Sequence, residues 1–459
     1  MERLSPLEAS FLAIEDAANH MHIGSIGIFA GPAPTYGELC GLVASKLALV
    51  PRYRQRVRTA PASIGRPVWV DDPGFRLERH ARHTVLPAPG GRAELRLLVG
   101  RLMSQQLDRG QPLWEDWMVE GLGDGHWALV TKVHHCMVDG IAGSDLLAVV
   151  LDREHEPGPV PPDDWHPRPE PSVADLALHS LRGLAAAPMT WVRGAGDALR
   201  HPDATLTRAW DVAVGLGRLG GLVRPVPPST LTGPIGPDRR WDCARATLAE
   251  IKEVRSVLGG TVNDIVLAAV TRGFRDLLAA REEPLADRVV RSLVPVSLRT
   301  PDARGVFDNR VTAVVADLPV GVEDPVERLA AVQAQMESLK LSHEADASEV
   351  ITAAVGFAPP MLTALLTRVA IHRQHSVETI TTNVPGPQIP LYALGRRMLE
   401  AYPYVPISGT IQIGVAVWSY DGGLHFGVTG DWDAVPDLAV LGAGITDGLR
   451  ELRHAAGGT

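Results

Sequence analysis

About a third of the way along this chain, residues Glu154 to Ser172 read EHEPGPVPPDDWHPRPEPS. Proline fixes φ and lacks a backbone N–H, so a segment this rich in it cannot form a helix or an interior strand. The sequence on both sides alternates between strand-like and helix-like periodicity. We therefore predict an α/β protein with two lobes, residues 1–153 and 238–459, joined by a long crossover at residues 154–237.

The apolar spacing within each lobe predicts its elements. In the first lobe it predicts strands at His22–Phe29 and Trp127–His135, and helices at Tyr36–Val50, Ala93–Leu107 and Ile141–Leu151. The crossover is expected to be helical from Val173 to about Arg200. In the second lobe we expect helices at Leu248–Leu258, Val262–Ala280, Pro325–Lys340 and Pro436–Leu452, and strands at Val289–Val296, Val311–Leu318, Val377–Thr382, Ile411–Trp418 and Leu424–Thr429. Two such lobes favour a ligand site in the cleft between them.

The charge balance and the cysteine pattern exclude several functions. The chain has 44 Lys or Arg and 53 Asp or Glu, a net charge of −9, whereas a general nucleic-acid binder needs a basic surface. Cys40, Cys136 and Cys243 form neither a disulfide framework nor a metal-ligand spacing, as is typical of a cytoplasmic protein. The charged N-terminus does not resemble a signal peptide. Two prolines interrupt the apolar stretch Val350–Thr367, so we expect short apolar helices there and no membrane span.

Residues Trp127 to Gly143 read WALVTKVHHCMVDGIAG, an apolar strand that ends in two adjacent histidines. Neighbouring residues of a strand point to opposite faces, so the rings of His134 and His135 should not converge on one ligand. Neither an HExxH nor a CxxC spacing is present. We therefore expect no metal site.

His135 and Asp139 flank the predicted turn from strand to helix, and Gly140 can adopt conformations there that other residues avoid. Such turns face the ligand cleft in α/β lobes. A histidine in that place can act as a general base, taking a proton from a hydroxyl that then attacks an activated acyl group. A pair of buried structural histidines explains the pattern equally well, and the spacing alone leaves both interpretations open.

HHCMVDG, His134 to Gly140, matches the HHxxxDG pattern of a large superfamily of acyltransferases that use acyl thioesters, including chloramphenicol acetyltransferase and peptide-synthetase condensation domains. Along nearly its whole length, the chain resembles the bacterial wax ester synthase/diacylglycerol acyltransferase family, and within it the actinobacterial triacylglycerol synthases. The resemblance implies two chloramphenicol-acetyltransferase-like lobes with mixed sheets and flanking helices. The other blocks that carry it are LSPLEASFL (Leu4–Leu12), PRYRQRV (Pro51–Val57), LDRGQPLWE (Leu107–Glu115), TVNDIVLA (Thr261–Ala268), VPVSLR (Val294–Arg299) and NVPGP (Asn383–Pro387).

The resemblance also implies roles for the motif residues. It makes His135 the general base, with acyl-CoA as co-substrate and with no metal, other cofactor or covalent enzyme intermediate. His134 is expected to support the fold or orient its neighbour. Asp139 is expected to pair with an arginine that holds the turn, and Arg299 is our candidate, because a guanidinium matches a buried carboxylate well. Gly140 is expected to allow the backbone conformation of the turn and to take no part in the chemistry.

In the second lobe, the resemblance places Asn263 near the substrates. Asn263 and Asp264 stand at a predicted helix start, where either side chain can cap free amide groups, so capping remains an alternative. Thr382 and Asn383 end a strand before the rigid VPGP turn, and we treat them as candidates for contacting the substrate oxyanion. Trp114 is expected to pack in the core.

Together these implications predict transfer of a long-chain acyl group from acyl-CoA to diacylglycerol, which forms triacylglycerol. Such substrates reside in lipid, so we expect a cytoplasmic protein that is peripheral on the inner membrane face or on lipid droplets, through the apolar helices near Val173–Arg200 and Val350–Thr367. Transfer to a long-chain alcohol, giving a wax ester, is the alternative acceptor reaction. Condensation on a carrier-bound thioester is disfavoured because no carrier module accompanies the chain. A third alternative is a lipid-binding relic, a protein that has kept this fold without its activity. The presence of His135, Asp139 and Gly140 counts against it, because such a protein would not need a general base.

Overall fold

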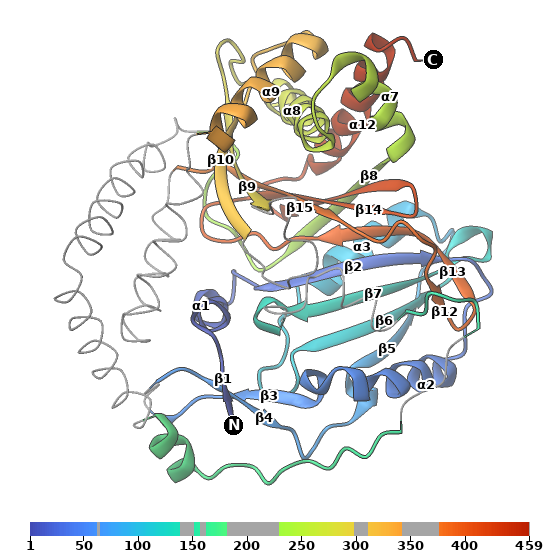
Figure 1. Ribbon diagram of the computed structural model, residues 1–459, viewed down its shortest axis with the longest axis vertical. Coiled ribbons are helices and arrows are strands. Elements are labelled where there is room, and N and C mark those ends of the chain that lie inside the picture. Colours follow the sequence, from blue (N-terminus) through green and yellow to red (C-terminus); the bar gives the residue numbers. More distant parts are fainter. Residues whose placement is uncertain are drawn as a thin grey trace, which may run out of the picture.

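The computed structural model describes residues 1–61, 65–137, 151–156, 162–180, 229–297, 311–341 and 376–458. These residues form two six-stranded sheets and one three-stranded sheet, with helices around them (Figure 1). Both large sheets contain parallel and antiparallel pairs, which confirms the predicted α/β class with mixed sheets. The strand orders are β12-β13-β2-β7-β6-β5, β10-β9-β11-β14-β15-β8 and β1-β4-β3.

Both faces of the first large sheet are covered. Its elements are β2 (His22–Phe29), β5 (Ala81–Val85), β6 (Trp114–Glu120) and β7 (Trp127–His134), flanked by α1 (Pro6–Ile14), α2 (Tyr36–Lys46) and α3 (Arg92–Met103), and by the small sheet of β1 (Glu2–Arg3), β3 (Gln55–Arg58) and β4 (Val68–Asp71). Apolar residues of α3 pack on one face, and those of α2 and the small sheet pack on the other. Every residue of β7 is therefore buried, including Lys132, whose Nζ donates to the carbonyls of Leu102 and Gln105.

The second large sheet carries its helices on one face, at the top of Figure 1. Its elements are β8 (Arg239–Thr247), α7 (Leu248–Leu258), α8 (Val262–Ala280), β9 (Val290–Ser297), β10 (Val311–Leu318), α9 (Pro325–Leu341), β11 (Thr379–Pro385), β14 (Ile413–Tyr420), β15 (Gly423–Asp431) and α12 (Leu438–Ala455). Helices α7 and α8 each begin with a capping box, Thr247 with Glu250 and Thr261 with Asp264, which satisfies free amide groups and fixes the first turn.

A strand from late in the sequence completes the first sheet. The short strand β12 (Tyr392–Ala393) and the long strand β13 (Arg396–Tyr404) leave the second lobe, and β13 pairs antiparallel with β2, with Tyr402 opposite Ile26. Glu400 of β13 also forms ion pairs with Arg92 of α3 and with Arg245 of β8. The two lobes are thus tied together by a shared sheet as well as by the crossover.

Gly427 of β15 lies where β13 crosses the second sheet. A Cβ atom added at Gly427 would stand 1.7 Å from the carbonyl oxygen of Pro403, so any side chain must push the two strands apart. We expect Gly427→Ala to destabilise the fold by about 3 kcal/mol, the upper range for overpacking. Gly41→Ala is the matched control, because a Cβ on this α2 residue meets no atom within 4 Å and should stabilise by about 0.5–1 kcal/mol. Thermal unfolding of both variants tests this, and a Gly427→Ala variant as stable as the wild type would contradict the close crossing.

In the described part of the proline-rich connector, residues 154–156 form bends and residues 162–172 form neither helix nor strand. Ion pairs hold it against the small sheet: Asp163 pairs with Arg54, Arg168 with Asp71, and Glu170 with Arg56. A helix begins at residue 173 and is described as far as residue 180. Of the predicted helix Ile141–Leu151 only Leu151 is described, and it lies in a bend. The predicted helix at 350–367 and the rest of the one at 173–200 lie outside the described residues. The predicted lobe boundaries remain predictions.

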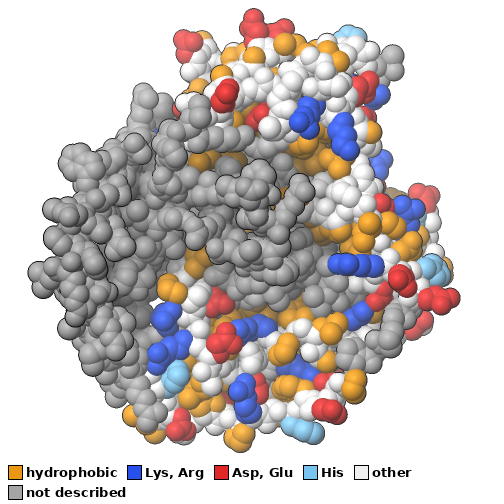
Figure 2. Space-filling model, in the orientation of Figure 1, with side chains coloured by type: hydrophobic (Ala, Val, Ile, Leu, Met, Phe, Trp, Pro, Cys, Tyr) orange, Lys and Arg blue, Asp and Glu red, His pale blue; other side chains and the backbone are white. Residues whose placement is uncertain are grey.

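In the described part of the chain, no single helix is long and apolar enough to cross a membrane. The helices α7 and α8, bent by 99° to each other, pass that test only as a pair, and both contribute to the core of the second lobe. On the face shown in Figure 2, the described acidic and basic side chains are interspersed, without a continuous basic surface.

Candidate active site

The histidine pair lies where the central strand of the first sheet ends. β7 stops at His134, one residue earlier than predicted, and His135 begins the 3₁₀ turn η6 (His135–Met137). The backbone N–H of His135 still donates to the carbonyl of Met21 at 2.8 Å, which extends the ladder with β2. The ring of His135 lies against Phe11 of α1, with 4.0 Å between ring centroids, and the residue is half-buried.

His134 is fully buried, and each of its ring nitrogens faces a protein group. Its Nδ1 accepts a hydrogen bond from the backbone N–H of Cys136 at 3.1 Å. Its Nε2 lies 3.5 Å from Oε1 of Glu15, close enough for an electrostatic contact but without the geometry of a hydrogen bond. The two imidazoles therefore have different partners. This geometry favours the structural role predicted for His134.

Glu15 and Arg109 complete this corner of the site, and neither was predicted to have a role there. Both Nε and Nη2 of Arg109 donate to Oε2 of Glu15, at 2.9 and 2.6 Å. Burial alone would raise the pKa of Glu15, but His134 and Arg109 outweigh it and lower that pKa to about 2, so the carboxylate is ionised at neutral pH. The signal was available, because Glu15 follows the block LSPLEASFL and Arg109 lies within LDRGQPLWE.

Two predicted residues of the second lobe meet at the end of β11. Nδ2 of Asn383 donates to Oδ1 of Asn263 at 3.3 Å, although 120 residues separate them. The cap of α8 is formed by Thr261 with Asp264, so Asp264 has a capping role and Asn263 is free to reach Asn383. Thr382 points to the other face of the sheet, the side of Ile380, which packs against a small apolar cluster away from the helices.

Trp114 is fully buried, as expected. Its ring stacks between Tyr53 and His80, at centroid distances of 4.6 and 4.7 Å, and its Nε1 donates to the carbonyl of Tyr53. Asp139, Gly140 and Arg299 lie outside the described residues. The Asp139–Arg299 pair therefore remains a prediction.

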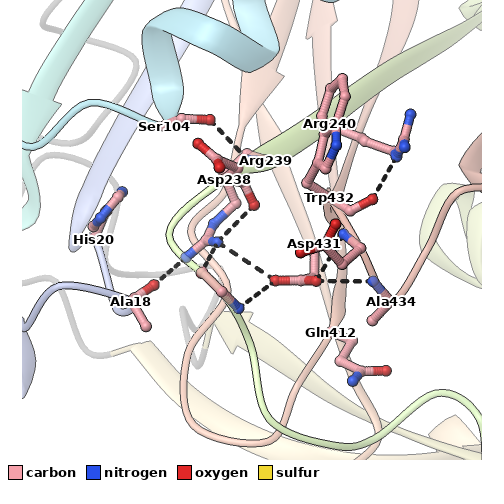
Figure 3. A network of polar contacts seen from close by, with 12 residues as sticks. Ala18, His20, Ser104, Asp238, Arg239, Arg240, Gln412, Asp431, Trp432 and Ala434 are labelled. Atoms are coloured by element: carbon pink, nitrogen blue, oxygen red, sulfur yellow. Dashed lines mark hydrogen bonds and ion pairs between the residues drawn. The ribbon is translucent and has the colours of Figure 1, made fainter.

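A buried arginine connects the second lobe to the segment that leads into β2 (Figure 3). Arg239, 1% exposed, donates to the carbonyls of Gly236, Asp238 and Ala18, and its Nη1 lies 3.8 Å from Asp431. Its backbone N–H donates to the hydroxyl of Ser104 at the end of α3. Since Ala18 lies three residues before Met21, which pairs with His135, this network fixes the strand beside the proposed base. An arginine is expected to be exposed from sequence alone, so the burial of Arg239 was not predicted.

Among the described residues, no group of three or more His, Cys, Asp or Glu side chains could hold a metal ion. The described residues instead offer one half-buried imidazole against Phe11 in the first lobe and one amide pair, Asn263 with Asn383, in the second. Such a site is suited to proton transfer beside an apolar substrate.

The described residues thus combine two linked α/β lobes with a histidine pair at the end of a central strand. The first condensation domain of a calcium-dependent antibiotic synthetase shares this fold, with a TM-score of 0.59 at 16% identity over 98% of this chain and 96% of that one. The wax ester synthase/diacylglycerol acyltransferase of Marinobacter aquaeolei is more similar, with a TM-score of 0.70 at 26% identity, covering 99% of this chain and 100% of that chain.

The chain belongs to the wax ester synthase/diacylglycerol acyltransferase family and so is an acyltransferase. The catalytic domain of that family matches residues 4–266, and its C-terminal domain matches residues 307–453. Two curated relatives are each 36% identical over 98% of this chain and 96% of their own length: a probable diacylglycerol O-acyltransferase of Mycobacterium tuberculosis and a putative one of Mycobacterium bovis.

Proposed function

We propose that this chain transfers a long-chain acyl group from acyl-CoA to the free hydroxyl of diacylglycerol, with His135 as the general base. The observation that carries the proposal is the contrast between the two histidines. His134 is fully buried, whereas His135 is half-buried in a turn at the end of β7. The names of the curated relatives support diacylglycerol as the acceptor.

The reaction needs one base and donors for the developing oxyanion. His135 takes the proton of the acceptor hydroxyl, whose oxygen forms a bond to the thioester carbonyl carbon. The negative charge on the carbonyl oxygen then requires fixed donors. Thr382 and Asn383 are our candidates, but they point to opposite faces of β11, so only one of the two side chains can supply such a donor. Collapse of the intermediate re-forms the carbonyl and breaks the C–S bond, and the CoA thiolate takes up the proton from the imidazolium. The ester and free CoA are the products, and no metal or covalent enzyme intermediate is needed.

The lipid substrates place the enzyme at a lipid surface. We propose that it is peripheral on the inner membrane face or on lipid droplets. In the described part of the helix that starts at residue 173, Val173 is 64% and Leu178 47% exposed. Apolar side chains this exposed on one helix fit insertion into the boundary between headgroups and acyl chains.

The same chemistry with a long-chain alcohol would make a wax ester, and the family name covers both reactions. Purified protein should therefore be given palmitoyl-CoA with diolein in phospholipid vesicles, with hexadecanol, or with no acceptor, while free CoA is measured by mass spectrometry. We expect release that depends on acceptor and is faster with diolein. Release with hexadecanol alone would indicate a wax synthase, and no release with either acceptor would favour the lipid-binding relic.

A further inference from the structure

We infer that helix α1 positions the proposed base: Phe11 lies against the ring of His135, while Glu15, one helical turn later, holds His134 and through it the turn that carries His135. The inference rests on the proposed function in one respect, that His135 is the base. It adds Glu15 as a positioning residue for the reaction.

Helix α1 is itself firmly placed. Ser5 and Glu8 form a capping box at its start, and Glu8 is buried although it is charged. At its other end, the N–H of Glu15 donates to the carbonyl of Phe11, so the two residues lie on the same side of the helix, four positions apart. Phe11 and Glu15 therefore face the two histidines from one rigid element.

A chain of contacts leads from Arg109 to the turn. Arg109 fixes Glu15 with two donors to one carboxylate oxygen and also donates to the carbonyl of Leu12 at 2.8 Å. The other carboxylate oxygen of Glu15 faces Nε2 of His134 at 3.5 Å. On the far side of the same ring, Nδ1 accepts from the N–H of Cys136, the residue directly after His135. Three sequence blocks far apart in the chain thus meet on one buried ring.

These contacts select one tautomer of His134. Nδ1 must carry a lone pair, because a backbone N–H points at it, so in the neutral ring the proton resides on Nε2. An ionised carboxylate in front of Nε2 stabilises that proton, whereas the opposite tautomer would put a lone pair against the carboxylate and two protons between Nδ1 and Cys136. The hydrogen bond to Cys136 then closes η6 around His135. Loss of Glu15 should loosen this turn without removing any group that contacts substrate.

Two substitutions at His134 distinguish the role of Nδ1 from that of Nε2. In His134→Asn the amide oxygen takes the place of Nδ1 and can still accept from Cys136, whereas in His134→Gln the amide takes the place of Nε2 and the turn loses its acceptor. We expect His134→Asn to retain at least roughly a tenth of the wild-type kcat, and His134→Gln to fall about 10-fold lower, since small misplacements of a catalytic group cost up to about 10²-fold. Equal losses, or a more active Gln variant, would overturn the inference.

Glu15→Gln tests the carboxylate, with Glu337→Gln on the exposed side of α9 as the matched control. We expect kcat for Glu15→Gln to fall about 10-fold, KM for acyl-CoA to change less than about 3-fold, and the control to behave as the wild type. In a His134→Asn background, Glu15→Gln should have little further effect, because the shortened side chain no longer reaches the carboxylate. Additive losses, or a change in KM alone, would contradict a positioning role.

A readout that does not require activity keeps this inference separate from the proposed function. In ¹⁵N-histidine-labelled wild-type protein, with the His134 signals assigned through His134→Asn, NMR at pH 7 should show protonated Nε2 and unprotonated Nδ1. The opposite tautomer would overturn the inference even if acyl transfer is observed. If this tautomer is found and the enzyme with His135→Asn remains fully active, the positioning chain stands and the proposed base fails.

Discussion

Replacing His135 with asparagine should leave a folded protein whose acyl-transfer kcat is lower by about 10²–10⁴-fold, the usual contribution of a general base. Asparagine is close to histidine in size near Cβ and can keep the contact with Phe11 partly filled, but it cannot accept the proton of a hydroxyl at neutral pH. The N–H of residue 135 would still donate to the carbonyl of Met21, so the end of the β2–β7 ladder should persist. KM for acyl-CoA should change little, because the base acts mainly in the transition state.

The control is His454→Asn, which changes an exposed histidine in the last turn of α12. It should match the wild type in both turnover and thermal stability. Circular dichroism and a thermal melt establish whether each variant is folded before its rate is interpreted. Turnover by folded His135→Asn within about 3-fold of the wild type would remove His135 from the mechanism.

At pH 8, Asp116→Asn should unfold at a higher urea concentration than the wild type, which is unusual for a substitution in a protein core. Asp116 of β6 is fully buried, and neither of its carboxylate oxygens has a hydrogen-bond partner in the described part of the chain. It lies in one row across the sheet with Thr131 of β7 and Ser25 of β2, whose buried hydroxyls also have no partner among the described residues. An unpaired charge in such a place is costly.

The pH dependence of stability follows from the shifted pKa of Asp116. Burial raises its pKa from 3.8 to about 7, against a weaker opposing effect of Thr131. The folded state therefore binds a proton more tightly than the unfolded state, so this group's contribution to stability is complete below pH 3.8 and is lost as the pH rises through about 7. Each pKa unit corresponds to about 1.4 kcal/mol, which gives a loss on the order of 4 kcal/mol by pH 8.

Urea unfolding at pH 5 and pH 8 measures this effect. The wild type should lose stability between the two values, and Asp116→Asn should lose less. Asp433→Asn, which changes an exposed carboxylate after β15, is the matched control and should leave the wild-type pH dependence unaltered. A fall in stability of equal size for the wild type and Asp116→Asn would show that another group titrates and that the Asp116 carboxylate is satisfied by ordered water.

Local periodicity predicted the helices and strands whose apolar spacing and caps are visible in the sequence itself. The structure has β2, β10, α7 and α8 at the predicted bounds. The two helices begin at Thr247 and Thr261 caps, which a sequence displays openly. By contrast, β8 (RRWDCARAT) and β13 (RRMLEAYPY) were not predicted, because charged residues and a proline obscure the alternation. Their place in the sheets depends on pairing with strands far away in the chain.

The candidate site also has features that could be predicted from sequence and features that could not. The motif placed His134 and His135 at the end of a strand, and the structure has them there. The contact between Asn263 and Asn383, the buried Arg239 and the pair of Glu15 with Arg109 depend on tertiary packing. A charged residue that is buried by the fold looks in sequence like any exposed one. Hence the position of the histidine pair was predictable from sequence, whereas the residues that surround it were not.

The most direct test of the whole account is a mass balance on one reaction. Purified protein is given radiolabelled palmitoyl-CoA and diolein in phospholipid vesicles, and free CoA and labelled triacylglycerol are measured together over time. We expect one triacylglycerol for each CoA released, with little free palmitate. CoA released with palmitate in place of triacylglycerol would make the protein a thioesterase towards this substrate, and it would contradict transfer to the glyceride hydroxyl.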